Sequence, residues 1–215
     1  MKLRELKGRK WMTPSAGLQR LQTLGFISQT LPEIGGSRNW RKGQFKKYFE
    51  EYQSALFTYG LSQGAISYHW EYSYGESQNR EFDCAIRCEL PQEDGGVVVK
   101  PVQLKELPPD VVNPQVSLQD LINSLVKYTA QAGEEMLAVA IFCNRGSSIN
   151  FKKLTIPPLQ IAQLWIYGFL DHQNCFLVEI GSAARLNFNY PRFTKVNDFK
   201  TSNSTPPSNT SRAQV

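Results

Sequence analysis

The chain has 215 residues, of which 41% are hydrophobic and 20% charged, a composition typical of one globular domain with a substantial core. No apolar run reaches the length of a membrane span, and the basic N-terminus lacks the apolar stretch of a secretory signal. We therefore expect a cytoplasmic protein with no membrane-bound part. The four cysteines form no CxxC pair, which indicates reduced thiols in the core.

Positive charge is concentrated in the N-terminal part of the chain. Residues 1–47 hold eleven Lys or Arg and two Glu, a net charge of +9, whereas the whole chain carries +5 and the rest of it therefore −4. A basic arm ahead of a mildly acidic domain favours a polyanionic partner such as nucleic acid, with a solubilising arm as the alternative. The residues predicted to contact nucleic acid combine cations with one aromatic ring: Arg38, Trp40, Arg41, Lys42, Lys46 and Lys47.

Two helices are predicted at the start of the chain. Ser15 suits the cap of a short helix over residues 15–25. A stronger helix is predicted over residues 44–59, where Gly60 is expected to end it. Its apolar residues recur at helical spacing and form one stripe: Phe45, Phe49, Tyr52, Leu56 and Tyr59.

Strands are predicted next, over residues 65–74, 80–90 and 97–106, and the turn-forming sequence between them indicates a meander. A helix is then predicted from Ser117 to a stop at Gly133.

The last part of the chain begins with an apolar run at residues 136–143, which suits a strand buried on both faces. Pro157-Pro158 predicts the start of another helix over residues 159–170, and residues 175–180 form a final buried strand. Beyond about residue 199 the sequence is dominated by Ser, Thr, Asn and Pro, which predicts a disordered tail.

Two polar segments stand out on the second and third predicted strands. Asp83 lies on the second strand, and Gln103-Leu104-Lys105 lies on the third, where Gln103 and Lys105 share one face because side chains alternate along a strand. A carboxylate beside a carbonyl oxygen and an ammonium suits a divalent metal and a phosphodiester. If the Asp83 face is open to solvent, that residue is an ordinary surface acid. No GxSxG, Walker A or GxGxxG pattern supports another chemistry.

The order of one helix, three strands, a helix and a strand over residues 44–143, with Asp83 on the second strand and QxK on the third, resembles the core of the PD-(D/E)XK nuclease superfamily. The resemblance implies an α/β, restriction-endonuclease-like fold. Such a fold has a mixed central sheet flanked by helices in the order αβββαβ, here followed by an extra helix–strand unit.

The same resemblance implies the roles of individual residues. Lys105, Asp83 and Gln103 would be catalytic, and the metal would be held by Asp83, Gln103 and an acid of the first helix. Glu50 and Glu51 are the candidates for that acid, and we favour Glu51, which lies slightly nearer the edge of the apolar stripe. Gln103 departs from the usual Asp or Glu, which removes one negative charge from the metal site.

The resemblance therefore predicts a Mg²⁺-dependent DNA endonuclease, with Mn²⁺ as an alternative cofactor, in a mobile-element, defence or DNA-repair setting. Two alternatives stay open. Gln103 favours a catalytically inactive nuclease-fold module that binds DNA or protein, and the arm favours a small interaction protein from a mobile element or toxin system. The predicted organisation is a basic arm with a short helix over 1–43, an α/β domain over 44–198 and a disordered tail over 199–215. Whether the protein forms a homodimer is left open by the sequence.

Overall fold

The computed structural model of the protein describes residues 9–24, 43–64, 68–74, 82–90, 96–132, 137–145, 149–171 and 173–191. Its helices are α1 (Pro14–Thr23), α2 (Gly43–Gly64) and α3 (Leu118–Ala132). Its strands are β1 (His69–Tyr74), β2 (Cys84–Glu89), β3 (Val97–Leu107), β4 (Ala138–Cys143), β5 (Gln163–Phe169), β6 (Asn174–Ile180) and β7 (Arg185–Asn189).

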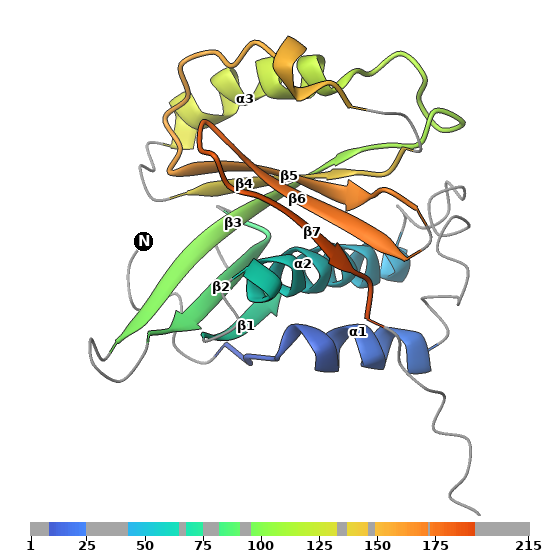
Figure 1. Cartoon of the computed structure of the whole chain (residues 1–215), viewed down its shortest axis with the longest axis vertical. Helices are drawn as coiled ribbons and strands as arrows, with labels where there is room; N and C mark the ends of the chain where they lie inside the picture. Colours follow the sequence, from blue (N-terminus) through green and yellow to red (C-terminus); the bar gives the residue numbers. More distant parts are fainter. Residues whose placement is uncertain are drawn as a thin grey trace, which may run out of the picture.

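All seven strands belong to one sheet, in which their spatial order is the same as their order in the sequence. The pairs β3–β4 and β4–β5 are parallel, and the other neighbours are antiparallel. The sheet curls into a half-barrel, with α2 in its hollow, α1 beneath α2 and α3 on the opposite face (Figure 1). The curl follows from the right-handed twist of strands, which accumulates over neighbouring strands.

The hollow of the sheet is filled by large side chains of α2. Tyr52, Leu56 and Phe57 are fully buried and pack on the inner face of the sheet. There Phe142 of β4 and Tyr167 of β5 lie with ring centroids 5.3 Å apart. Burial of aromatic rings of this size is the dominant favourable contribution to such a core.

The helix predicted in the N-terminal arm is part of this same core. Leu18 and Leu21 of α1 are fully buried and belong to the cluster that α2 forms with the sheet. The bounds of α1 lie within one or two residues of the predicted helix.

The outer face of the sheet packs against α3. Ile122 and Leu125 of the helix are buried with Val139 and Ile141 of β4, so β4 is covered on both faces, as expected from its apolar sequence. At the start of α3, the Ser117 hydroxyl accepts a hydrogen bond from the Asp120 N–H at 3.1 Å, the pattern of an N-terminal cap.

The prediction that Gly60 ends the second helix is wrong, because α2 continues to Gly64. Gly60 allows β7 to approach instead. A Cβ atom at this position would lie 3.0 Å from two ring atoms of Phe188, closer than packed side chains normally come. Phe45, predicted as part of the buried stripe, is 43% exposed and lies near the start of the helix.

The predicted fold class is wrong. We expected an α/β restriction-endonuclease-like core with a central sheet flanked by helices and an extra helix–strand unit. The described residues instead form a curled seven-stranded sheet with three α-helices, so that strands dominate. The segment 159–170, predicted as a helix, contains β5, and β7 was not predicted. In β5, Leu164 and Ile166 face α3 while Trp165 and Tyr167 face α2, an alternation of aliphatic and aromatic residues that suits a strand buried on both faces.

Several local predictions are confirmed. Strands β2 and β3 pair antiparallel, and all six residues of β4 are buried in the same sheet. The four cysteines are free and buried.

Among the described helices, none combines the length and the apolar character needed to cross a membrane. The tail predicted to be disordered, residues 199–215, lies outside the described residues.

Candidate active site

The candidate site lies where β2 stops pairing with β3. The two strands pair as far as Cys84 opposite Val102, and among the described strands β3 then continues to Leu107 with β4 alone beside it. The edge of β3 that faces β2 is therefore open beyond Val102. Asp83 fills this gap: its N–H donates to the Val102 carbonyl at 3.1 Å, and its Oδ2 accepts from the Leu104 N–H at 2.7 Å.

The side chains of Gln103 and Lys105 adjoin Asp83, as the strand alternation predicted. The Gln103 amide N–H donates to the same Asp83 oxygen that Leu104 contacts, and Gln103 is only 7% exposed. Burial raises the pKa of the Asp83 carboxyl, while the Leu104 hydrogen bond and the charges of Lys105 and Lys46 oppose the rise. Burial lowers the pKa of the Lys105 ammonium, and the charge of Asp83 opposes that shift. The partial burial of the site thus disfavours the charged forms of Asp83 and Lys105, and each group partly offsets this for the other.

The opposite wall of the site comes from the first turns of α2. Relative to Lys46, the residues Phe49, Glu50 and Gln53 lie three, four and seven positions further along, so all four share one face of the helix. Between this face and β3 lies a cavity of about 380 Å³. Its lining consists of Lys46, Phe49, Glu50, Gln53, Asp83, Gln103, Leu104, Lys105 and Glu106.

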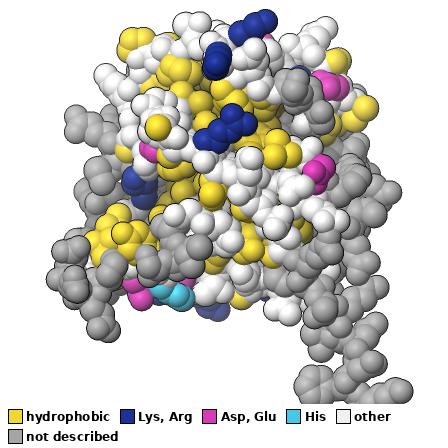
Figure 2. All heavy atoms as spheres, viewed as in Figure 1, with side chains coloured by type: hydrophobic (Ala, Val, Ile, Leu, Met, Phe, Trp, Pro, Cys, Tyr) yellow, Lys and Arg dark blue, Asp and Glu magenta, His cyan; other side chains and the backbone are white. Residues whose placement is uncertain are grey.

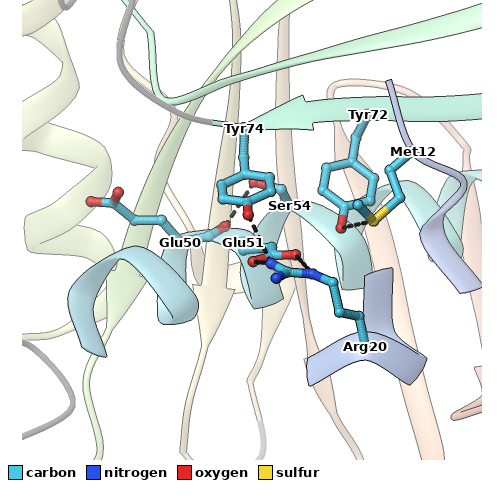
Figure 3. A network of polar contacts seen from close by, with 7 residues as sticks. All are labelled: Met12, Arg20, Glu50, Glu51, Ser54, Tyr72 and Tyr74. Atoms are coloured by element: carbon cyan, nitrogen blue, oxygen red, sulfur yellow. Dashed lines mark hydrogen bonds and ion pairs between the residues drawn. The ribbon is translucent and has the colours of Figure 1, made fainter. Parts of the chain in front are cut away.

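Of the two glutamates considered for the metal site, Glu50 lines the cavity and Glu51 does not. The fully buried Glu51 side chain points toward α1, where Arg20 binds both of its oxygens (Figure 3). The Nε–Oε1 distance is 3.0 Å, and Arg20 also donates to the Tyr74 hydroxyl at 2.8 Å. Of the two glutamates, Glu50 therefore lies in the same cavity as Asp83 and Gln103, whereas Glu51 is bound by Arg20.

The residues predicted to contact nucleic acid are only partly described. Arg38, Trp40, Arg41 and Lys42 lie outside the described residues. Lys46 lines the cavity and forms an ion pair with Glu50 at 3.5 Å, whereas the exposed Lys47 is not among the lining residues. On the face seen in Figure 2, Lys and Arg side chains of the described residues are interspersed with apolar and uncharged ones.

Two lining residues were missed by the sequence analysis. Gln53 follows Glu50 by one helical turn, and that spacing was the available signal. Glu106 follows Lys105 directly, and the amide of Asn144 donates to its Oε1 at 3.1 Å. On strand alternation alone, Glu106 belongs to the other face of β3 from Lys105. The sequence pattern therefore did not assign Glu106 to the site. Glu106 reaches the cavity because the cavity opens at the edge of the strand.

The donor atoms around the cavity suit Mg²⁺ better than a softer metal. The atoms of Asp83, Glu50, Glu106 and Gln103 that can bind a metal are carboxylate and amide oxygens. Within the part of the chain that the structure describes, no three His, Cys, Asp or Glu residues are close enough together to hold a metal ion. Mg²⁺ does not require such a cluster, because it commonly keeps several waters and binds one or two carboxylates together with substrate phosphate.

Comparisons with family models, with curated proteins and with solved structures found no match to this chain. The candidate site therefore stands on its own geometry.

Asp83→Asn is expected to stabilise the free protein at neutral pH. The folded-state pKa of Asp83 is raised, so its contribution to stability is present below its unfolded pKa and is lost as the pH rises through the folded pKa. Asparagine keeps an oxygen for the Leu104 N–H and carries no charge. Urea denaturation should give equal stability for variant and wild type at about pH 3, below the ordinary carboxyl pKa. At pH 7 the variant should be the more stable, and a less stable variant at pH 7 would contradict this account of Asp83.

Proposed function

We propose that this protein is a Mg²⁺-dependent nuclease that hydrolyses phosphodiester bonds in DNA. The observation that carries the proposal is the convergence of Asp83, Gln103, Lys105 and Glu50 on one cavity at the open edge of β3. The first three were expected together from the sequence, and Glu50 joins them from a separate element. A carboxylate and an ammonium that are both half-buried and lie together in a cavity are more typical of a catalytic site than of a surface ion pair.

Asp83 and Glu50 would hold the cation, with the amide oxygen of Gln103 as a further ligand. When bound, Mg²⁺ would polarise the phosphodiester and stabilise the charge on the leaving oxygen. Lys105 donates from its ammonium to the attacking water or to a phosphate oxygen, where negative charge develops during the reaction. The surrounding burial strengthens this interaction because the local dielectric constant is low.

DNA is the proposed substrate because of the charge distribution along the chain. The first 47 residues carry a net charge of +9 while the rest of the chain carries −4, and Lys46 of this segment lines the cavity. Cations that bind phosphates along a nucleic acid bring its backbone to the site without requiring a particular sequence.

A catalytically inactive DNA- or protein-binding module is the second candidate. The observation that favours it is Gln103 itself, which donates its amide N–H to Asp83 and brings no charge of its own. Such a protein would keep the cavity and the basic segment but would bind Mg²⁺ weakly.

Gln103→Glu distinguishes the two candidates. In the free protein the new carboxylate lies against Asp83, so the variant should melt at a lower temperature than wild type in the presence of a chelator. Mg²⁺ should restore the melting temperature of the variant and raise it more than that of wild type, because the cation relieves the repulsion. The control is Gln115→Glu, the same change at an exposed loop position. If Mg²⁺ does not change the melting temperature of Gln103→Glu, the inactive module is favoured.

A further inference from the structure

Gln53 is a buried polar residue of α2 whose side-chain amide is not used by the described part of the fold. It is 4% exposed, yet it lies in the lining of the cavity. Its backbone carbonyl accepts a hydrogen bond from the Tyr167 hydroxyl at 3.1 Å, but among the described residues its side-chain amide forms no hydrogen bond. The amide atoms of Gln53 are not among the fully buried side-chain atoms without a partner, so they are open to the water of the cavity, where a bound ligand could contact them.

The amide of Gln53 faces a cavity whose other polar groups come from both walls. Lys46 and Glu50 lie on the same face of α2, and Asp83 and Lys105 lie across the cavity on the β2–β3 side. With Glu106, the lining carries two cations and three anions. A free anion is disfavoured in such a site, whereas an anion that arrives with a divalent cation matches both sets of charges.

We propose that Gln53 is a substrate-binding residue whose amide N–H donates a hydrogen bond to a phosphate oxygen held in the cavity together with Mg²⁺. This inference rests on the proposed function. Gln53 would be a neutral donor on the α2 wall, opposite the cation of Lys105 on the other wall. A neutral amide adds a hydrogen bond to the phosphate without competing with the carboxylates for the cation.

The test compares Gln53→Met with Gln63→Met, which removes a half-buried amide from the other end of the same helix. Methionine has a similar volume and no hydrogen-bonding group. The melting temperature of Gln53→Met without ligand should be close to that of wild type, because the lost amide had no partner among the described residues. A clear fall in melting temperature, or failure to fold, would show that the fold itself uses the amide and would overturn the proposal.

The second measurement is calorimetric titration of inorganic phosphate in the presence of Mg²⁺. The dissociation constant should rise about 5- to 10-fold in Gln53→Met, the effect of losing one net hydrogen bond, and should not change in Gln63→Met. Equal constants in wild type and Gln53→Met, or no phosphate binding by wild type, would overturn the inference. Phosphate binding that depends on Gln53 in a protein that cuts no DNA would support the inference while contradicting the proposed function.

Discussion

Arg20→Ala is expected to lower the free energy of unfolding by about 3 kcal/mol, the lower end of the range for breaking a buried ion pair. The truncation leaves the Glu51 carboxylate, which is fully buried, without the guanidinium that binds both of its oxygens. It also removes the hydrogen bond to the Tyr74 hydroxyl. The loss should stay near the lower end because the Arg20 side chain is 38% exposed, so water reaches Glu51 once it is removed. Urea denaturation at neutral pH measures the change.

The double variant Arg20→Met/Glu51→Met is the control for this prediction. Replacing both members of a buried pair with apolar residues of similar length is often neutral, because no charge is left without a partner. The double variant should therefore recover most of the stability lost in Arg20→Ala. If the double variant is as unstable as the single one, the effect of Arg20 comes from packing of its aliphatic stem and not from the buried charge of Glu51.

Lys105→Met is expected to lower the rate of Mg²⁺-dependent DNA cleavage by about 10²- to 10³-fold, the usual effect of removing one donor to a developing charge. The fold should persist, because burial lowers the pKa of the Lys105 ammonium and the apolar replacement avoids that cost. Initial rates of cleavage of a labelled duplex, with near-equal melting temperatures for variant and wild type, provide the measurement.

Lys100→Met is the matched control on the same strand. Lys100 is also half-buried, and burial lowers its pKa as well, but it contacts Gln163 at the far end of β3 and does not line the cavity. Its replacement should leave the cleavage rate within about twofold of wild type, since surface and structural lysines outside the site do not contact the reacting phosphate. Equal losses of cleavage rate in Lys105→Met and Lys100→Met would show that the effect comes from the overall positive charge of the sheet and not from Lys105 itself.

The convergence of Asp83, Gln103 and Lys105 could be predicted from sequence because it depends on local rules. Side-chain alternation puts Gln103 and Lys105 on one face, and a short connection makes β2 and β3 neighbours. The choice between Glu50 and Glu51 could not be predicted. It is decided by Arg20, which lies some thirty residues earlier in the sequence and reaches Glu51 only through the packing of α1 against α2.

The fold class was harder to predict, for a related reason. Pro157-Pro158 was interpreted as a helix start, but the next regular element is β5, which pairs parallel with β4 and antiparallel with β6. Strand propensity in this segment depends on those neighbours, and a single sequence does not reveal them. The edge strand β7 is only five residues long, and its alternation was too short to separate from a loop.

The role of Asp83 also exceeds what the sequence indicated. A metal ligand alone would contribute little to folding, whereas Asp83 accepts the N–H that β3 exposes beyond Val102. Asp83→Ala therefore removes a structural acceptor together with the charge, and Asp83→Asn is the variant that separates the two.

We propose that the cavity between α2 and β3 is a Mg²⁺-dependent nuclease site. The most direct measurement is the rate of DNA strand cleavage by the purified protein as Mg²⁺ is titrated, with Asp83→Asn in parallel. The rate of cleavage by the wild type is expected to rise with Mg²⁺ to saturation and to fall to zero in a chelator. The Asp83→Asn variant is expected to remain folded and inactive. Wild-type protein that cleaves no DNA with Mg²⁺ or Mn²⁺, or an Asp83→Asn variant that cleaves as fast as wild type, would contradict this proposal.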